Sequence, residues 1–143
     1  QKYTAAAKPT ESLVTAGLHK GENYDIVYSG GMMAALAFDA AIRNHTNGAA
    51  SIDDYIREIY TRFPKDKPGA PAIAVDDLIR VATEVGGEEA AQTLNSIIHT
   101  SGKFSLDDTF DILGLTVDET GAVALRDGPT ERQSALWSAI VQR

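Results

Sequence analysis

Tyr28 is the side chain in this sequence best suited to take part in a reaction. A phenol has a pKa of about 10, so at neutral pH it can donate a hydrogen bond to a developing oxyanion without losing its proton. Gly31 follows one helical turn later and would let another backbone or a substrate approach closely. Tyr28 is therefore a candidate catalytic residue. The alternative is an amphipathic residue at a helix end, with its ring in the core and its hydroxyl in water.

The other reactive residue types are poorly arranged for chemistry. No histidine has a second histidine or a carboxylate at the i, i+4 spacing of a two-ligand metal site, and no serine has a flanking nucleophile elbow. The spacing around Gly30-Gly31 fits neither the dinucleotide-binding fingerprint nor the Walker motif for phosphate binding. A close crossing of two helices is the simpler explanation for this pair of glycines. Paired carboxylates could act as general acid and base, but each pair falls in the first turn of an expected helix, which indicates capping. These pairs are Asp53/Asp54, Asp76/Asp77, Glu88/Glu89 and Asp107/Asp108.

The composition is that of a small acidic domain. A length of 143 residues fits one domain, residues 1–143, because domains commonly run to about 100–150 residues. The net charge of -7 argues against a nucleic-acid partner, which requires clustered Lys and Arg. The absence of cysteine excludes disulfides and thiolate chemistry, although it leaves the cellular compartment open. Because the first residue is Gln1 rather than methionine, we expect the natural polypeptide to begin upstream.

A long helix over residues 24–43 is expected at the centre of the fold. The stretch from Gly30 to Phe38 is apolar on nearly every face, and a helix without a polar face must be surrounded by other elements. Asp39 and Arg43, four residues apart, are expected to form an internal ion pair. They also interrupt the apolar run before the roughly 20 residues that a bilayer requires, so no membrane span is predicted.

The remaining pattern predicts a mostly α-helical fold. Capping residues, glycines and apolar spacing indicate further helices over residues 9–18, 51–63, 75–85, 88–100 and 105–113 and from residue 129 onward, with a surface loop at 64–71. Alternation at 115–117 and 122–125 predicts a small hairpin. We therefore expect a multi-helix orthogonal bundle around a central buried helix, with a β-hairpin near the C-terminus. Two helices carry apolar stripes predicted to be buried: Ile52, Tyr55, Ile56, Ile59, Tyr60 and Phe63 in one, and Leu136, Trp137, Ile140 and Val141 in the other.

Several of these segments carry a family resemblance. Residues 22–31, the run Phe38-Asp39-Ala40-Ala41-Ile42-Arg43, and Gly48 with Ser51-Ile52-Asp53-Asp54 resemble the region downstream of the zinc site in the glycyl-aminopeptidase family of metallopeptidases. Residues 75–78 and 102–115 are similar to the closing helices of that family. The similarity spans about residues 9–116.

The resemblance implies a role in a gluzincin-type zinc aminopeptidase. In such enzymes zinc activates water, an upstream glutamate is the general base, and a tyrosine stabilises the tetrahedral intermediate. By position that tyrosine corresponds to Tyr28, or to Tyr24 if the register is shifted, and Gly30 and Gly31 would contact the substrate. The implied substrates are peptides with small N-terminal residues such as glycine or alanine.

The sequence departs from the family pattern in two places. Gly30 occupies the position where the family usually has a basic residue, which affects the substrate contacts. The H-E-x-x-H helix and the third zinc ligand are absent, so zinc is implied only for a full-length protein whose zinc-binding half is the main partner of this chain. Alone, the chain is expected to bind no zinc and to have no peptidase activity. The alternative is a non-catalytic helical protein-interaction or scaffold domain.

Overall fold

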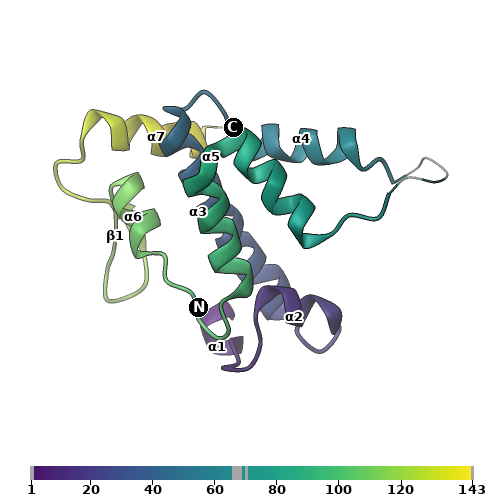
Figure 1. Cartoon of the computed structure of the whole chain (residues 1–143). Helices are drawn as coiled ribbons and strands as arrows, with labels where there is room; N and C mark the ends of the chain where they lie inside the picture. Colours follow the sequence, from purple (N-terminus) through teal and green to yellow (C-terminus); the bar gives the residue numbers. More distant parts are fainter. Residues whose placement is uncertain (1, 66–68, 70, 143) are drawn as a thin grey trace.

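The protein folds as a mostly α-helical orthogonal bundle around one central helix, with a small hairpin near the C-terminus, as predicted (Figure 1). The computed structural model describes residues 2–65, 69 and 71–142. In chain order the elements are α1 (Lys2–Ala6), α2 (Leu13–Leu18), the π-helical turn η1 (Ile26–Gly30), α3 (Gly31–Thr46), α4 (Ile52–Arg62), α5 (Val75–His99), α6 (Asp107–Leu113), β1 (Leu115–Val117), β2 (Val123–Leu125) and α7 (Glu131–Val141). The predicted surface loop at 64–71 lies partly outside the described residues.

The central helix α3 runs through the middle of the molecule, with α5 packed along it (Figure 1). The part of α3 that is buried differs from the stretch that was expected to be surrounded, Gly30 to Phe38. Met32, in the most apolar stretch, is 72% exposed, whereas the residues from Ala37 to Arg43 are all buried. The reason is that α4, α6 and α7 gather around the second half of the helix. Asn47 ends the helix in a left-handed conformation, as the Asn47-Gly48 signal predicts.

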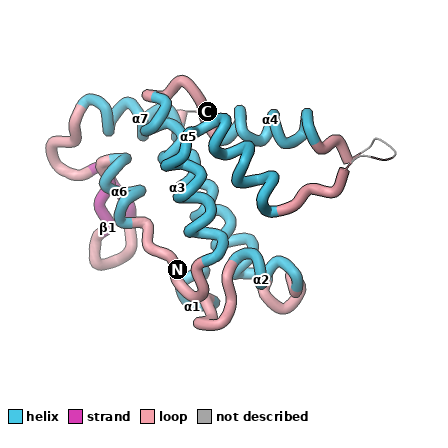
Figure 2. Tube along the Cα trace, in the orientation of Figure 1, coloured by secondary structure: helices cyan, strands magenta, loops and turns pink. Residues whose placement is uncertain are grey.

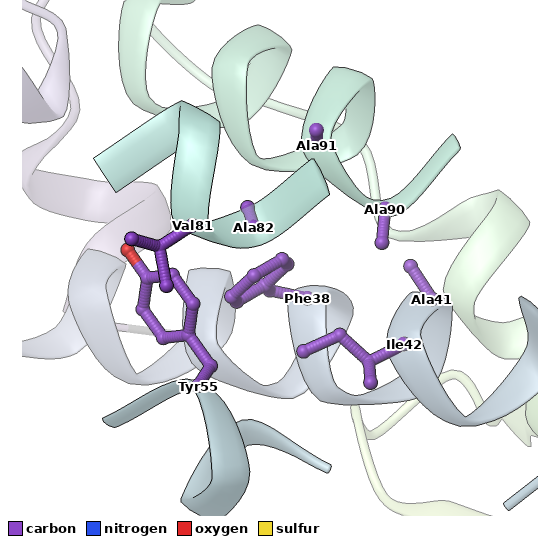
Figure 3. Packing of buried hydrophobic residues seen from close by; sticks show 8 residues of the cluster. All are labelled: Phe38, Ala41, Ile42, Tyr55, Val81, Ala82, Ala90 and Ala91. Atoms are coloured by element: carbon purple, nitrogen blue, oxygen red, sulfur yellow. The ribbon is translucent and has the colours of Figure 1, made fainter. Parts of the chain in front are cut away.

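Small residues let α5 approach α3 closely. The shared core contains Phe38, Ala41, Ile42, Tyr55, Val81, Ala82, Ala90 and Ala91 (Figure 3). The rings of Phe38 and Tyr55 pack edge to face, 4.9 Å between centroids. At Gly86 an added Cβ would lie 2.7 Å from Cγ1 of Ile42, so α5 crosses α3 closely at this glycine. At Gly31, part of the pair where a close crossing was expected, an added Cβ would have nothing within 4 Å.

Length alone does not exclude a membrane span, contrary to the expectation. The segment Ile26–Thr46 is long and apolar enough by composition, but 56% of its most apolar window is buried inside the fold. Within it, Arg43 Nε donates to Asp39 Oδ2 at 3.0 Å, and both side chains are buried, which confirms the predicted ion pair. This arrangement is typical of the core helix of a globular domain.

Three helix starts follow the predicted capping pattern. Ser51 with Asp54 and Thr130 with Gln133 form capping boxes at the starts of α4 and α7. In α5 the predicted break is present, because Gly87 has non-helical backbone angles of φ 79° and ψ 174° between two helical halves. Glu88 and Glu89 therefore open the second half, as expected.

Two other helix starts were predicted too early. The first helix begins at Leu13 rather than at residues 9–11, because Ser12 and Thr15 form its capping box. The helix expected from residue 105 begins at Asp107, whose N–H donates to Ser105 Oγ at 3.0 Å. In both cases a serine hydroxyl, of Ser12 or of Ser105, accepts a hydrogen bond from an N–H group in the first turn of the helix. The short α1 had no prediction.

The two predicted apolar stripes are only partly buried. In α4, Tyr55 and Ile59 face the core, whereas Ile56 and Tyr60 are 43% and 63% exposed. Each residue of a helix is rotated by about 100° around the axis, so Tyr55 and Ile59 lie on one edge of the apolar stripe and Ile56 and Tyr60 on the other. The helices α3 and α5 cover only the edge with Tyr55 and Ile59. In α7, Leu136 is buried but Val141 in the last turn is 51% exposed.

The hairpin is held to the bundle by buried Leu115 and by Arg126. Leu115 pairs with Leu125 and Val117 with Val123, but only Leu115 is buried. Two isolated strands are marginally stable. The Arg126 guanidinium donates to Asp111 Oδ1 at 2.7 Å and to the carbonyls of Phe110 and Leu115, which fastens the returning strand to α6.

Burial of Tyr55 predicts a stability loss at high pH. Its hydroxyl donates to the Leu78 carbonyl at 3.3 Å, and burial raises its pKa from 10.0 to about 12. Between these values the unfolded chain releases the proton while the folded chain retains it, so the stability present below pH 10 is lost as the pH rises toward 12. In thermal unfolding followed by circular dichroism, the wild-type Tm should fall more steeply across this range than that of Tyr55→Phe. Parallel Tm curves would show that Tyr55 titrates normally.

Candidate functional site

Tyr28 lies at the surface on the π-helical turn that leads into α3. Its side chain is 48% exposed, so the alternative in which the ring is buried in the core is wrong. Tyr24 is 61% exposed, and the two rings lie 4.4 Å apart between centroids with planes tilted by 37°. The two tyrosines that the sequence offered as alternatives therefore form one exposed aromatic pair.

The wide turn ends at Gly31. The N–H of Gly31 bonds the carbonyls of both Val27 and Tyr28, where the π-helical turn passes into the regular helix. Single π-helical turns occur frequently at functional sites, because the extra residue changes the direction of the side chains that precede the helix. Ile26 and Gly30 of this turn are buried, while Tyr28 between them is directed outward.

Lys20 is the charged neighbour of Tyr28, and it was not predicted from the sequence. Its Nζ lies 4.9 Å from the centroid of the Tyr28 ring, a cation–π contact. A hydrogen bond to the Tyr28 side chain raises the pKa of Lys20 above its usual value, so Lys20 is charged at neutral pH. The eight positions that separate them in sequence cross the turn between α2 and η1, so the two residues do not share one helix and no helical spacing could have paired them.

The two glycines have different surroundings. Gly30 is buried, whereas no side chain or distant backbone lies within 4 Å of a Cβ placed on Gly31. Nothing in the described chain makes the close approach that this glycine allows. The surface beside Gly31 is therefore open to another molecule or another segment.

The hollow next to the aromatic pair is small. It has a volume of about 250 Å³, and Lys8, Asn23, Tyr24 and Asp25 contribute polar or aromatic groups to its lining. Lys8 is held in place by a 2.7 Å hydrogen bond to Asn23 Oδ1. Ligand pockets usually measure about 300–1,000 Å³, so this hollow would be at most one end of a peptide-binding groove.

The described residues do not supply a zinc site. Among them, no three His, Cys, Asp or Glu side chains lie close enough together to hold a metal ion. His45 approaches Glu89, with Nδ1 3.9 Å from Oε2, and His99 Nδ1 lies 2.9 Å from its own helix's Asn95 carbonyl. The zinc that the resemblance implies does not fit this part of the chain.

Two of the four acidic pairs contain a carboxyl that caps a helix, as predicted: Asp54 accepts the N–H of Ser51 and Asp77 that of Ala74. Hydrogen bonds from Ser51, followed by Arg57, lower the pKa of Asp54, and Arg80, followed by the Ala74 N–H, lowers that of Asp77. Both carboxyls are therefore ionised partners of a helix start, which disfavours a general-acid role.

Comparisons with known proteins add no assignment. No protein-family model matches the chain, and no curated protein or solved structure is significantly similar to it.

Proposed function

We propose that this domain is the C-terminal helical part of a zinc-dependent aminopeptidase-like protein. In this proposal it forms one wall of the active-site cleft, and Tyr28 stabilises the tetrahedral intermediate during hydrolysis of peptides with small N-terminal residues. Zinc would be held by the rest of the same polypeptide, where it would activate the attacking water. The proposal stems from the resemblance over residues 9–116.

The observation that supports it best is the exposed phenol of Tyr28 beside an ammonium group. Tyr28 is half-exposed on the turn before α3, and Lys20 lies against its ring. An oxyanion placed at this hydroxyl would receive a hydrogen bond from an uncharged donor and attraction from a nearby positive charge. The open surface at Gly31 leaves space for a substrate backbone one turn away.

The test uses the polypeptide encoded by the natural reading frame that contains this chain. If that frame carries an H-E-x-x-H motif, hydrolysis of glycyl- and alanyl-p-nitroanilide should require zinc. Tyr28→Phe should then lower kcat by about 100-fold with little change in KM, because the hydrogen bond forms mainly in the transition state.

Two matched variants sharpen this test. Tyr60→Phe removes another exposed phenol, from α4, and should leave kcat unchanged. Tyr24→Phe identifies the alternative register if it, rather than Tyr28→Phe, abolishes turnover. Zinc content should be equal in all variants. If both Tyr24→Phe and Tyr28→Phe retain wild-type kcat, neither residue has the proposed role.

A second candidate function is a non-catalytic helical interaction domain. An apolar hollow of about 460 Å³ lies between α4 and the segment before α5, and Ile56, Tyr60 and Ile73 on its walls are 43%, 63% and 42% exposed. Exposed apolar surface of this kind is typical of contact sites. A reading frame without a zinc-binding motif, or with a degenerate one, would favour this function over the catalytic one.

A further inference from the structure

A second and larger cleft lies on another part of the molecule. It has a volume of about 550 Å³ and lies between the second half of α5 and α6, with α3 at its floor. Figure 2 shows the loop that joins the second half of α5 to α6, and residues of this loop also line the cleft. None of its lining residues belongs to the surface around Tyr24 and Tyr28. Its volume is within the usual range for small-molecule sites.

The cleft exists because the helix at its floor carries small side chains. Ala37 and Ala41 of α3 line it, where larger residues would fill the space. Ile97, Phe104 and Ile112 add apolar surface from three different elements. The cleft can therefore accommodate an apolar group next to polar ones.

Thr109 provides a polar group at the wall of the cleft. The residue as a whole is only 5% exposed, but its hydroxyl is not one of the buried side-chain atoms that lack a partner among the described residues, Arg43 Nη2 and Arg126 Nε. A ligand in the cleft would find this hydroxyl available for a hydrogen bond. By contrast, Thr93 and Thr100 bond carbonyls of their own helix.

Charges of both signs meet at this cleft. Lys103 and Asp108 line it, and within the described part of the chain neither side chain forms an ion pair with the other or with a third residue. Glu89 adds a second carboxylate, which among the described residues is paired with His45 at 3.9 Å. A simple anion would meet two carboxylates, and a simple cation would meet the ammonium of Lys103.

We propose that the cleft binds a small zwitterion, either a free α-amino acid or a dipeptide with an apolar side chain. The ligand's ammonium group would lie by Asp108 and Glu89, and its carboxylate would accept from Lys103. Its side chain would pack on Ile97, Phe104 and Ile112, with the Thr109 hydroxyl bonding a ligand oxygen. The proposal is independent of the peptidase role, because it uses a separate site within this chain.

The test is an NMR titration of the ¹⁵N-labelled chain with leucine and with alanyl-leucine. We expect amide shifts at the cleft residues and a Kd below about 1 mM for at least one of the two. The more tightly bound ligand decides between amino acid and dipeptide. N-acetyl-alanyl-leucine lacks the ammonium group and alanyl-leucinamide lacks the carboxylate, so each should bind at least about tenfold more weakly. Absence of shifts with both zwitterions at about 10 mM, or equal binding of the blocked forms, would overturn the proposal.

Matched variants connect the affinity to the named side chains. Lys103→Gln and Asp108→Asn should each weaken binding by about tenfold, and Thr109→Val should weaken it less. Lys65→Gln and Asp127→Asn remove charges outside the cleft and should leave the Kd unchanged. Circular dichroism spectra equal to wild type would show that the variants fold. Unchanged affinity in both Lys103→Gln and Asp108→Asn would rule out the charge pairing.

Discussion

Replacing Asp39 with alanine should destabilise the fold by about 3–5 kcal/mol, the usual cost of removing one partner from a buried ion pair. Asp39 and Arg43 are 6% and 5% exposed, so water could not replace the lost carboxylate. Asp39 Oδ1 also accepts the N–H of Ile52 at 2.8 Å, which connects the central helix to the start of α4. Arg43 Nη2 already lacks a partner among the described residues, so the variant would leave most of the guanidinium unpaired. Urea unfolding followed by circular dichroism measures the change.

Three further variants separate charge from shape. Asp39→Asn keeps an acceptor for Ile52 but removes the charge, so its loss should be smaller than that of Asp39→Ala. The double variant Asp39→Leu/Arg43→Met replaces the pair with apolar groups and should be closer to wild type than Asp39→Ala. Asp127→Ala removes an exposed carboxylate and serves as the charge control. A loss below about 1 kcal/mol for Asp39→Ala would show that Arg43 reaches water after all.

The sequence predicted local structure well, because local structure depends on residues close together in the chain. Capping residues such as Ser51 and Thr130 satisfy N–H groups within three positions, and Asn47 ends α3 through its own left-handed backbone. The ion pair of Asp39 and Arg43 was predictable for the same reason, since i+4 spacing places both on one helix face. Its connection to Ile52 was not, because that contact depends on how two helices meet.

Burial was predicted less well, because an apolar stripe shows which face is apolar but not which neighbours cover it. Ile56 and Tyr60 belong to the same stripe as Tyr55 and Ile59, yet the neighbouring helices reach only the edge with Tyr55 and Ile59. Met32 is exposed although its helix lacks a polar face. The burial of each side chain therefore depended on the arrangement of α4 to α7 around α3.

The two candidate sites also differ in how much of each could be predicted from the sequence. Tyr28 stood out in the sequence because of its residue type and the glycine after it, but its partner Lys20 comes from the turn after α2. The second cleft left no local pattern at all. Its floor, its charges and its hydroxyl come from α3, α5, α6 and the loop between α5 and α6, so only the assembled fold places Lys103, Asp108 and Thr109 around one space.

Gly87→Ala should cost about 3 kcal/mol, because two independent constraints favour glycine there. Its backbone angles of φ 79° and ψ 174° lie in a region that residues with a Cβ rarely adopt, and that strain alone costs about 1–3 kcal/mol. In addition, a Cβ at this position would collide with the His45 ring at the end of α3. The kink at Gly87 sets the direction of the half of α5 that lines the second cleft, so Gly87→Ala should also weaken zwitterion binding there.

A double variant separates the two constraints on Gly87. In a His45→Ala background the collision is absent, so Gly87→Ala should still destabilise the protein, but by less, through backbone strain alone. Gly31→Ala is the matched control, because Gly31 has helical angles and an added Cβ would have nothing within 4 Å. That substitution should stabilise the protein by about 0.5–1 kcal/mol, since glycine in a helix is entropically unfavourable. Equal free energies of unfolding for Gly87→Ala and Gly31→Ala would contradict the proposed role of the kink.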